Sequence, residues 1–138
     1  SPGKGLHHKP IARIASGGEL SRIMLALKLS LARADAVPTL VFDEVDSGIG
    51  GVTADVLAEK LSRIAGYHQV FSITHLPQIA AYSDHHMSVA KRETSKGIVT
   101  EVGILEGDGQ VEELMRMLGG EEATAEKHAL ALLKNKPA

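Results

Sequence analysis

The order of two short apolar segments and one helical segment most constrains how this 138-residue chain folds. Residues 39–42 form a short apolar run that ends in two acids, the pattern of a strand buried on both faces. A helical pattern follows and ends at Gly66, and residues 68–74 then predict the next strand. A strand, a helix and a strand in this order predict a right-handed crossover in a parallel α/β sheet. The functional loops of such a sheet lie at the carboxyl ends of its strands.

Further elements are expected on both sides of this crossover. Helices are expected at residues 16–34, 76–82, 111–118 and 123–133, and strands at residues 86–92 and 98–106. Pro77 fits the first turn of the short helix, because a proline there loses no hydrogen bond. We expect residues 1–138 to form one domain, since the chain is too short for two. A basic segment leads directly into the first helix, so the chain is expected to begin in the middle of a domain.

Charge is unevenly spread, although the formal net charge is only −2. Residues 1–33 carry six Lys or Arg and one acid, whereas residues 34–138 carry nine basic and sixteen acidic residues. Attraction for phosphate is therefore expected near the N-terminal third, although scattered bases also suit an ordinary solvated surface. The absence of cysteine excludes disulfides and thiolate zinc sites, and no apolar run of about 20 residues predicts a membrane span. We expect a soluble, intracellular protein.

The first candidate site is the segment Ser16-Gly17-Gly18-Glu19 at the start of the first helix. Ser16 and Glu19 have the spacing of a capping box, so a capped helix that binds nothing is one interpretation. Consecutive glycines also let a phosphate reach backbone N–H groups, and the helix dipole favours an anion. Glu19 lies close to that anion site. Its charge is compatible with binding only if the side chain turns back to cap the helix.

The second candidate site is the acid pair Asp43-Glu44, which follows the first predicted strand. Successive side chains of a strand point in opposite directions, so the two acids can take different roles. Asp43 would hold a hydrated Mg²⁺, and Glu44 would orient the water that attacks a γ-phosphate. Strands also commonly end in acids at the water boundary, so the pair alone does not decide the function.

The third candidate site is His75, at the end of the second predicted strand and 31 residues after Glu44. One helix lies between the two residues, so the spacing fits one crossover and predicts that His75 lies on a loop beside Glu44. Its imidazole would then hydrogen-bond the γ-phosphate. A single histidine at a strand end is often incidental, but the order of all three segments favours a triphosphate site.

Together these segments resemble the heads of ABC-type ATPases. The segment from Ser16 to Glu19 resembles the signature motif, with Glu where transporters usually have Gln, as in SMC-like proteins. Asp43 and Glu44 resemble the Walker B pair, and His75 resembles the switch histidine. Within that superfamily the chain is similar to the RecN family of bacterial DNA-repair proteins. The segments that carry this similarity are Ala15-Ser-Gly-Gly-Glu-Leu-Ser-Arg22, Phe42-Asp-Glu-Val-Asp-Ser-Gly-Ile-Gly-Gly51, Thr74-His-Leu-Pro-Gln-Ile-Ala-Ala81 and Met115-Arg-Met-Leu-Gly-Gly120.

The resemblance implies a P-loop NTPase-like ABC ATPase head with a parallel sheet, of which this chain is the C-terminal lobe. The sequence has no Gly-x-x-x-x-Gly-Lys-Ser/Thr loop, so the Walker A lobe is absent and the chain alone is expected to be inactive. In the family that lobe is N-terminal and separated by a long coiled coil. The resemblance also implies ATP and Mg²⁺ as cofactors, an ATP-dependent head–head homodimer, DNA as a partner, recombinational repair of double-strand breaks, and a cytoplasmic, nucleoid-associated location.

The loop after the acid pair departs from the transporter pattern. The resemblance aligns Ser47, Gly48 and Gly50 with the D-loop, but Gly50 stands where transporters have an aspartate, so that aspartate's contacts across a dimer cannot be assumed. Two other functions stay open: a head segment of another SMC- or ABC-type ATPase, and a non-catalytic module that supplies a signature surface for dimerisation. The segment that begins at Asp46 lacks the companions of a serine hydrolase, and the histidines lack a repeated metal-ligand spacing.

Overall fold

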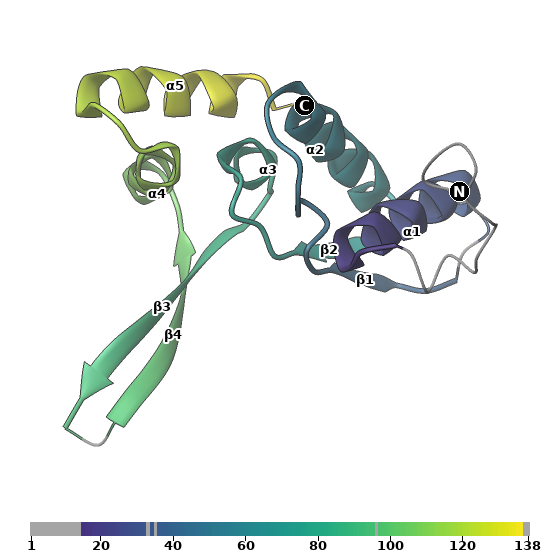
Figure 1. The fold of residues 1–138 in the computed structure, drawn as a ribbon, viewed down its shortest axis with the longest axis horizontal. Coiled ribbons are helices and arrows are strands. Elements are labelled where there is room, and N and C mark those ends of the chain that lie inside the picture. The colour runs from purple at the N-terminus through teal and green to yellow at the C-terminus, as the bar shows by residue number, and fades with distance from the viewer. Residues whose placement is uncertain (1–14, 33, 35, 96, 137–138) are drawn as a thin grey trace, which may run out of the picture. The chain divides into compact units, whose positions relative to one another are not determined.

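The structure, a computed structural model, describes residues 15–32, 34, 36–95 and 97–136. Contacts divide the chain into two compact units, one ending at Thr74 and the other beginning at His75 (Figure 1). Four of the bases expected to attract phosphate lie outside the described residues; they are Lys4, Lys9, Arg13 and Arg33. Within the described part of the chain, no helix is both long and apolar enough to cross a bilayer.

The first unit contains two helices and two strands. They are α1 (Gly17–Leu31), β1 (Thr39–Phe42), α2 (Val52–Ala65) and β2 (Gln69–Ser72). Strands β1 and β2 pair in parallel from Thr39 opposite Gln69 to Phe42 opposite Ser72, and α2 connects them. This confirms the predicted strand, helix and strand of a crossover unit.

Most of the buried hydrophobic residues of the first unit lie on α2. Helix α2 buries its apolar face, and Gly66 caps its end as the sequence predicts. Leu40 and Phe42 of β1 and Leu25 of α1 are also buried. The buried residues of α2 are Ala54, Leu57, Ala58, Leu61 and Ile64. Burying each of the larger of these side chains stabilises the fold by about 1.5–3 kcal/mol.

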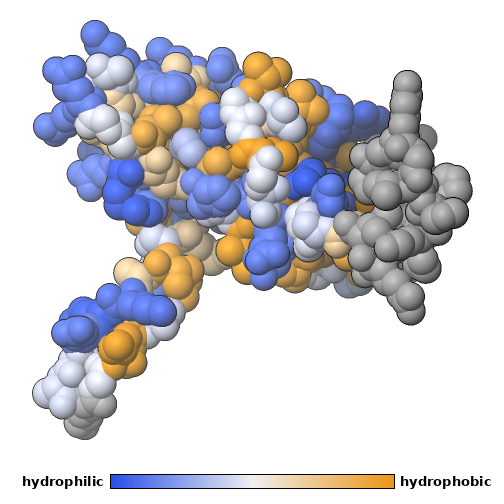
Figure 2. Space-filling model, viewed as in Figure 1, coloured by the Kyte–Doolittle hydropathy of each residue, from blue (hydrophilic) through white to orange (hydrophobic). Residues whose placement is uncertain are grey.

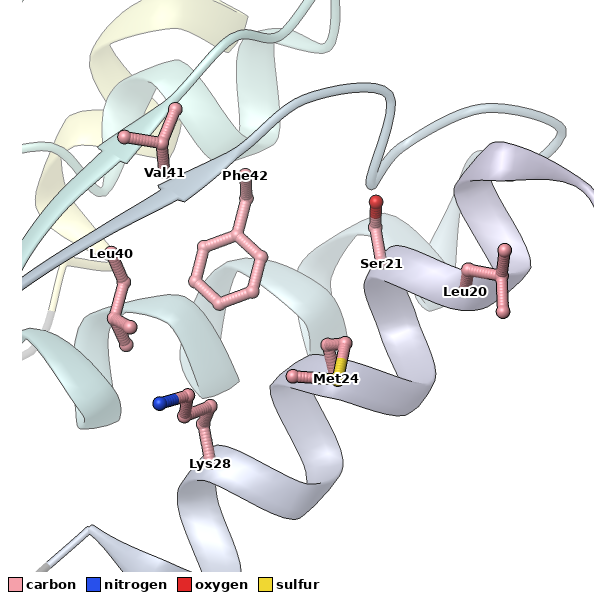
Figure 3. A pocket seen from close by; sticks show the side chains of 7 residues that line it. All are labelled: Leu20, Ser21, Met24, Lys28, Leu40, Val41 and Phe42. Atoms are coloured by element: carbon pink, nitrogen blue, oxygen red, sulfur yellow. The ribbon is translucent and has the colours of Figure 1, made fainter. Parts of the chain in front are cut away.

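The prediction that β1 is buried on both faces is wrong. Leu40 and Phe42 are buried, but Val41 between them is 67% exposed. Figure 3 shows Leu40 and Phe42 pointing toward α1, while Val41 points to the opposite side of the strand. Side chains of a strand alternate between faces, so helices on one side of the sheet bury only every second residue.

Helix α1 also leaves most of its apolar residues exposed. Leu25 is buried, but the residues whose helical spacing predicts α1 are 36–57% exposed. These residues are Leu20, Ile23, Met24, Leu27 and Leu31. An open groove of about 260 Å³ lies between α1 and β1, lined by apolar side chains together with Ser21 and Lys28 (Figure 3).

The second unit contains a β-hairpin and three helices. Its elements are α3 (Pro77–Ala81), β3 (His86–Thr94), β4 (Gly97–Leu105), α4 (Asp108–Leu118) and α5 (Glu122–Lys134). Pro77 is at the start of α3, as predicted. Side chains of all three helices form the core of this unit. Its buried residues are Ala80, Ala81, Leu114, Ala129 and Leu132.

Strands β3 and β4 pair with each other in an antiparallel hairpin, from His86 opposite Leu105 to Thr94 opposite Gly97. Both strands are predicted from the sequence, but they form a sheet of their own. Val89 faces Val102 across the hairpin, and these two residues are 70% and 63% exposed. Figure 2 shows hydrophobic patches on the hairpin between hydrophilic residues.

Candidate functional site

The start of α1 forms the predicted capping box. The Ser16 hydroxyl accepts a hydrogen bond of 3.3 Å from the Glu19 N–H, and the Ser16 N–H donates one of 2.8 Å to Glu19 Oε2. The Ser16 backbone N–H, its hydroxyl and Arg22 lower the pKa of Glu19. The Glu19 carboxylate therefore turns back onto Ser16, as anion binding at this helix start requires.

The acid pair Asp43-Glu44 lies in a tight turn directly after β1, and both residues are exposed. Glu44 has φ 55, so its backbone is in the left-handed region. A residue with a side chain adopts this conformation at a cost of about 1–3 kcal/mol, and such strain is concentrated at functional sites. The Ser21 hydroxyl of α1 donates a hydrogen bond of 2.9 Å to the Asp43 carbonyl, and within the turn the Ser47 N–H donates one of 2.9 Å to the Glu44 carbonyl.

The two glycines of the helix start lie directly against this turn. A Cβ added to Gly17 would lie 2.7 Å from Glu44 Oε2. A Cβ on Gly18 would lie 2.8 Å from the Glu44 carbonyl oxygen and 2.9 Å from the Ser47 Cβ. Real Cβ atoms do not approach other atoms so closely, so a side chain at Gly18 would require the turn to shift, whereas one at Gly17 would require only the Glu44 side chain to rotate. The glycines thus have a packing role that the sequence interpretation missed.

Arg22 joins α1 to the same turn and is a second residue that sequence reasoning missed. Its Nη1 donates hydrogen bonds of 3.0 Å to the Val45 carbonyl and 2.9 Å to the Ser47 carbonyl. Arg22 follows Glu19 by three residues and so lies on the same side of the helix, but this spacing does not predict that it reaches carbonyls of the turn.

Asp46 is buried on the other side of the turn, with 2% of its surface exposed. The Thr74 hydroxyl donates a hydrogen bond of 2.6 Å to its Oδ2. This bond ties the turn after β1 to Thr74, two residues beyond the end of β2, so the ends of the two parallel strands are linked. Sequence reasoning gave Asp46 no role of its own, and its burial and its bond to Thr74 are what reveal its structural role.

The predicted D-loop continues from this turn toward α2. Ser47 and Gly48 are exposed, and the Ile49 N–H donates to the Asp46 carbonyl over 3.3 Å. Gly48 has φ 72, a conformation that glycine adopts without a steric cost. Gly50 is also exposed, and a Cβ added there would meet no atom within 4 Å. Ser47, Gly48 and Gly50 thus present an exposed loop next to the acid pair.

The structure therefore brings two of the three candidate segments together. Residues 16–19 lie against the turn of residues 43–47 within the first unit. His75 is exposed and is the first residue of the second unit. Its predicted position beside Glu44 stays a prediction.

The fold as described is similar to a solved structure from work on ATP-driven dimerisation and DNA-stimulated activation of SMC ATPases. The two align with a TM-score of 0.58 at 22% sequence identity, over 85% of this chain and 70% of that one. The chain thus has the fold of part of an SMC-type ATPase head. No protein-family model matches the sequence.

Proteins similar in sequence show which family of SMC-like ATPases the chain belongs to. The chain is 49% identical to the DNA repair protein RecN of Streptomyces coelicolor, 48% to that of Deinococcus radiodurans and 42% to that of Bacillus subtilis. These matches cover 97%, 96% and 91% of this chain. The chain belongs to the RecN family. It spans only 24%, 23% and 22% of the length of these relatives.

Proposed function

We propose that residues 1–138 are the C-terminal segment of an ATP-binding and ATP-hydrolysing head in a RecN protein that acts in recombinational repair of DNA double-strand breaks. The observation that carries this proposal is the contact between the capped, glycine-led start of α1 and the acid pair after β1. The relatives named DNA repair protein RecN and the fold of an SMC ATPase support the same function.

Glu44 is proposed as the catalytic carboxylate that orients the attacking water, and its exposed position after β1 suits this role. Asp43 would hold Mg²⁺ through water, since Mg²⁺ keeps several waters and needs only one or two protein carboxylates. The ion would supply charge compensation for the phosphate oxygens. His75 is proposed to hydrogen-bond the γ-phosphate.

The start of α1 is proposed to bind ATP held by a partner head. Helix N-termini bind anions because their N–H groups and dipole face the ligand, and Glu19 is turned back by the capping box. The loop after the acid pair would accompany it at the head–head contact. The residues proposed for these roles are Ser16, Gly17, Gly18 and Glu19 in the signature, and Ser47, Gly48 and Gly50 in the D-loop.

The proposed assembly includes the N-terminal Walker A lobe of the same protein, which supplies the lysine and backbone cradle for the phosphates. Two such heads would associate with ATP between them, and the protein would act on DNA in the cytoplasm near the nucleoid. The segment alone is proposed to be inactive because this cradle is missing from its sequence.

The substitution Glu44→Gln tests the catalytic assignment in a full-length RecN protein that carries this chain. It keeps the size and hydrogen-bonding capacity of the side chain but removes its charge, so steady-state phosphate release should fall at least about 100-fold. ATP-dependent association of heads should persist in a sizing experiment, because the start of α1 is unchanged. Glu59→Gln, at an exposed carboxylate on α2, is the matched control and should retain wild-type turnover. Turnover by Glu44→Gln at the control rate would reject Glu44 as the catalytic carboxylate.

A further inference from the structure

We propose that Arg22 is a positioning residue for Glu44: its guanidinium fastens the turn of residues 43–47 to α1, so that the catalytic carboxylate moves with the signature helix start. This inference rests on the function proposed above. It gives a role to a residue outside the three candidate sites, which donates hydrogen bonds to two main-chain carbonyl oxygens of the turn.

The geometry of Arg22 suits a fastening role. One nitrogen, Nη1, donates to the carbonyls of Val45 and Ser47, which lie on either side of the buried Asp46. Val45 is fully buried, and the bond to its carbonyl is partly shielded from water. A charged donor makes a stronger hydrogen bond than a neutral one, and shielding from water strengthens it further. Loss of the guanidinium would therefore remove the charged link between α1 and this segment.

Glu44 is the residue of the turn that most needs such support. Its φ of 55 is not a conformation that a glutamate adopts readily, and its carboxylate lies against Gly17. Strained conformations persist only where surrounding contacts determine them. The Glu44 carbonyl accepts from the Ser47 N–H of its own turn, and Arg22 of α1 bonds the Val45 and Ser47 carbonyls, one and three residues beyond Glu44.

The consequence concerns how ATP binding and hydrolysis are connected. In the proposed dimer, the start of α1 meets the nucleotide held by the partner head. Because Arg22 joins that same helix to the turn, docking of α1 onto a partner's ATP would also fix Glu44 in its own head. The chemical step would then depend on Arg22 more strongly than ATP binding does.

The experiment compares Arg22→Ala, Arg22→Lys and the control Arg63→Ala in full-length RecN carrying this chain. Arg63 is an exposed arginine near the end of α2, in the same unit. For Arg22→Ala we expect kcat to fall about 10- to 100-fold, the size of loss that misplacement of a reacting group by about 1 Å produces. KM for ATP should change by less than about twofold, since ground-state binding is retained. Arg22→Lys should recover only part of the lost kcat. Its ammonium can donate to both carbonyls, but it is a compact charge on a flexible side chain and is not held in the fixed geometry of the guanidinium.

Two further measurements separate positioning from a purely structural role. Thermal unfolding should show each variant folded at the assay temperature; if Arg22→Ala does not fold, Arg22→Gln, whose shorter amide cannot reach both carbonyls, carries the same kcat test. The double variant Arg22→Ala/Glu44→Gln should hydrolyse ATP no more slowly than Glu44→Gln alone, since Arg22 acts through Glu44. A folded Arg22 variant that keeps the wild-type kcat would overturn the inference, whether or not its KM for ATP is raised. If Glu44→Gln leaves turnover intact, the proposed function itself fails, so the two failures are distinguishable.

Discussion

The turn after β1 and the outer face of β1 differ in how far the first unit itself holds or covers them. The turn receives hydrogen bonds from Ser21, Arg22 and Thr74, which lie in other parts of the first unit. The outer face of the sheet carries Val41 and its partner on β2, Phe71, which are 67% and 41% exposed. The site end is thus held by contacts within the unit, whereas the apolar side chains on the outer sheet face stay largely exposed.

This difference separates two kinds of interaction. Hydrogen bonds and close packing at the turn involve short segments that the first unit itself supplies. Apolar surface is stabilised only when another layer covers it, and extended exposed patches mark contact sites. We therefore expect the isolated chain to self-associate through surfaces such as the outer sheet face and the hairpin of β3 and β4, while its site turn keeps the described geometry.

The largest expected contrast is between the same substitution at Val45 and at Val41. Val45 is fully buried in the site turn, so Val45→Thr buries a hydroxyl and should lower the free energy of unfolding by about 1–3 kcal/mol. Val41→Thr places the hydroxyl on the exposed sheet face and should change it by less than about 0.5 kcal/mol. Urea unfolding followed by circular dichroism measures both values.

Sedimentation velocity completes this comparison. Val41→Thr should reduce concentration-dependent self-association of the isolated chain, because threonine keeps the shape and strand preference of valine while removing a methyl group from the apolar face. Equal losses of stability at the two positions would contradict the contrast between the buried site turn at Val45 and the exposed sheet face at Val41. So would a Val41→Thr chain that associates as strongly as the wild type.

A smaller contrast is expected between the two glycines of the helix start. Gly18→Ala places a Cβ 2.8 Å from a backbone oxygen that cannot rotate away, and should destabilise the fold by about 1–2 kcal/mol after the gain in helix preference. Gly17→Ala meets only the end of the Glu44 side chain, which can rotate, so stability should change by less than about 0.5 kcal/mol. Urea midpoints measure both. If Gly17→Ala destabilises the fold more than Gly18→Ala, the turn backbone adapts to a Cβ more easily than the Glu44 side chain does.

The sequence predicts the parallel crossover unit because its signals are local. Gly66 ends α2 where the apolar pattern stops, and the capping residues Ser16 and Glu19 bond to each other as their spacing requires. The resemblance to SMC-like ATPases likewise depends on short motifs that survive in a partial head. These features are determined by residues close together in the sequence, so they can be inferred without knowing which distant segments pack against them.

Contacts between distant segments could not be predicted in the same way. The sequence does not reveal that Arg22 reaches carbonyl oxygens 23 and 25 residues away, or that Thr74 bonds a buried Asp46 28 residues away. The prediction that β1 is buried on both faces failed for a related reason. An apolar run indicates that burial is favourable, but the layer that covers each face is set by other segments.

The smallest effect is expected at the capping carboxylate itself and depends on pH. The Ser16 backbone N–H lowers the pKa of Glu19 below its ordinary value of 4.5. A carboxyl group whose pKa is lowered by folding stabilises the folded state above its ordinary pKa, and this contribution is lost as pH falls through the lowered value. Glu19→Gln keeps an oxygen for the capping box but has no charge to titrate. The drop in melting temperature between about pH 6 and about pH 3 should therefore be smaller in Glu19→Gln than in the wild type.

Glu122→Gln, in the first turn of α5, is the matched control because that helix has no side-chain bond at its N-cap. A control variant that flattens the pH dependence as much as Glu19→Gln would show that general helix electrostatics, and not the bond to Ser16, holds this carboxylate at the site.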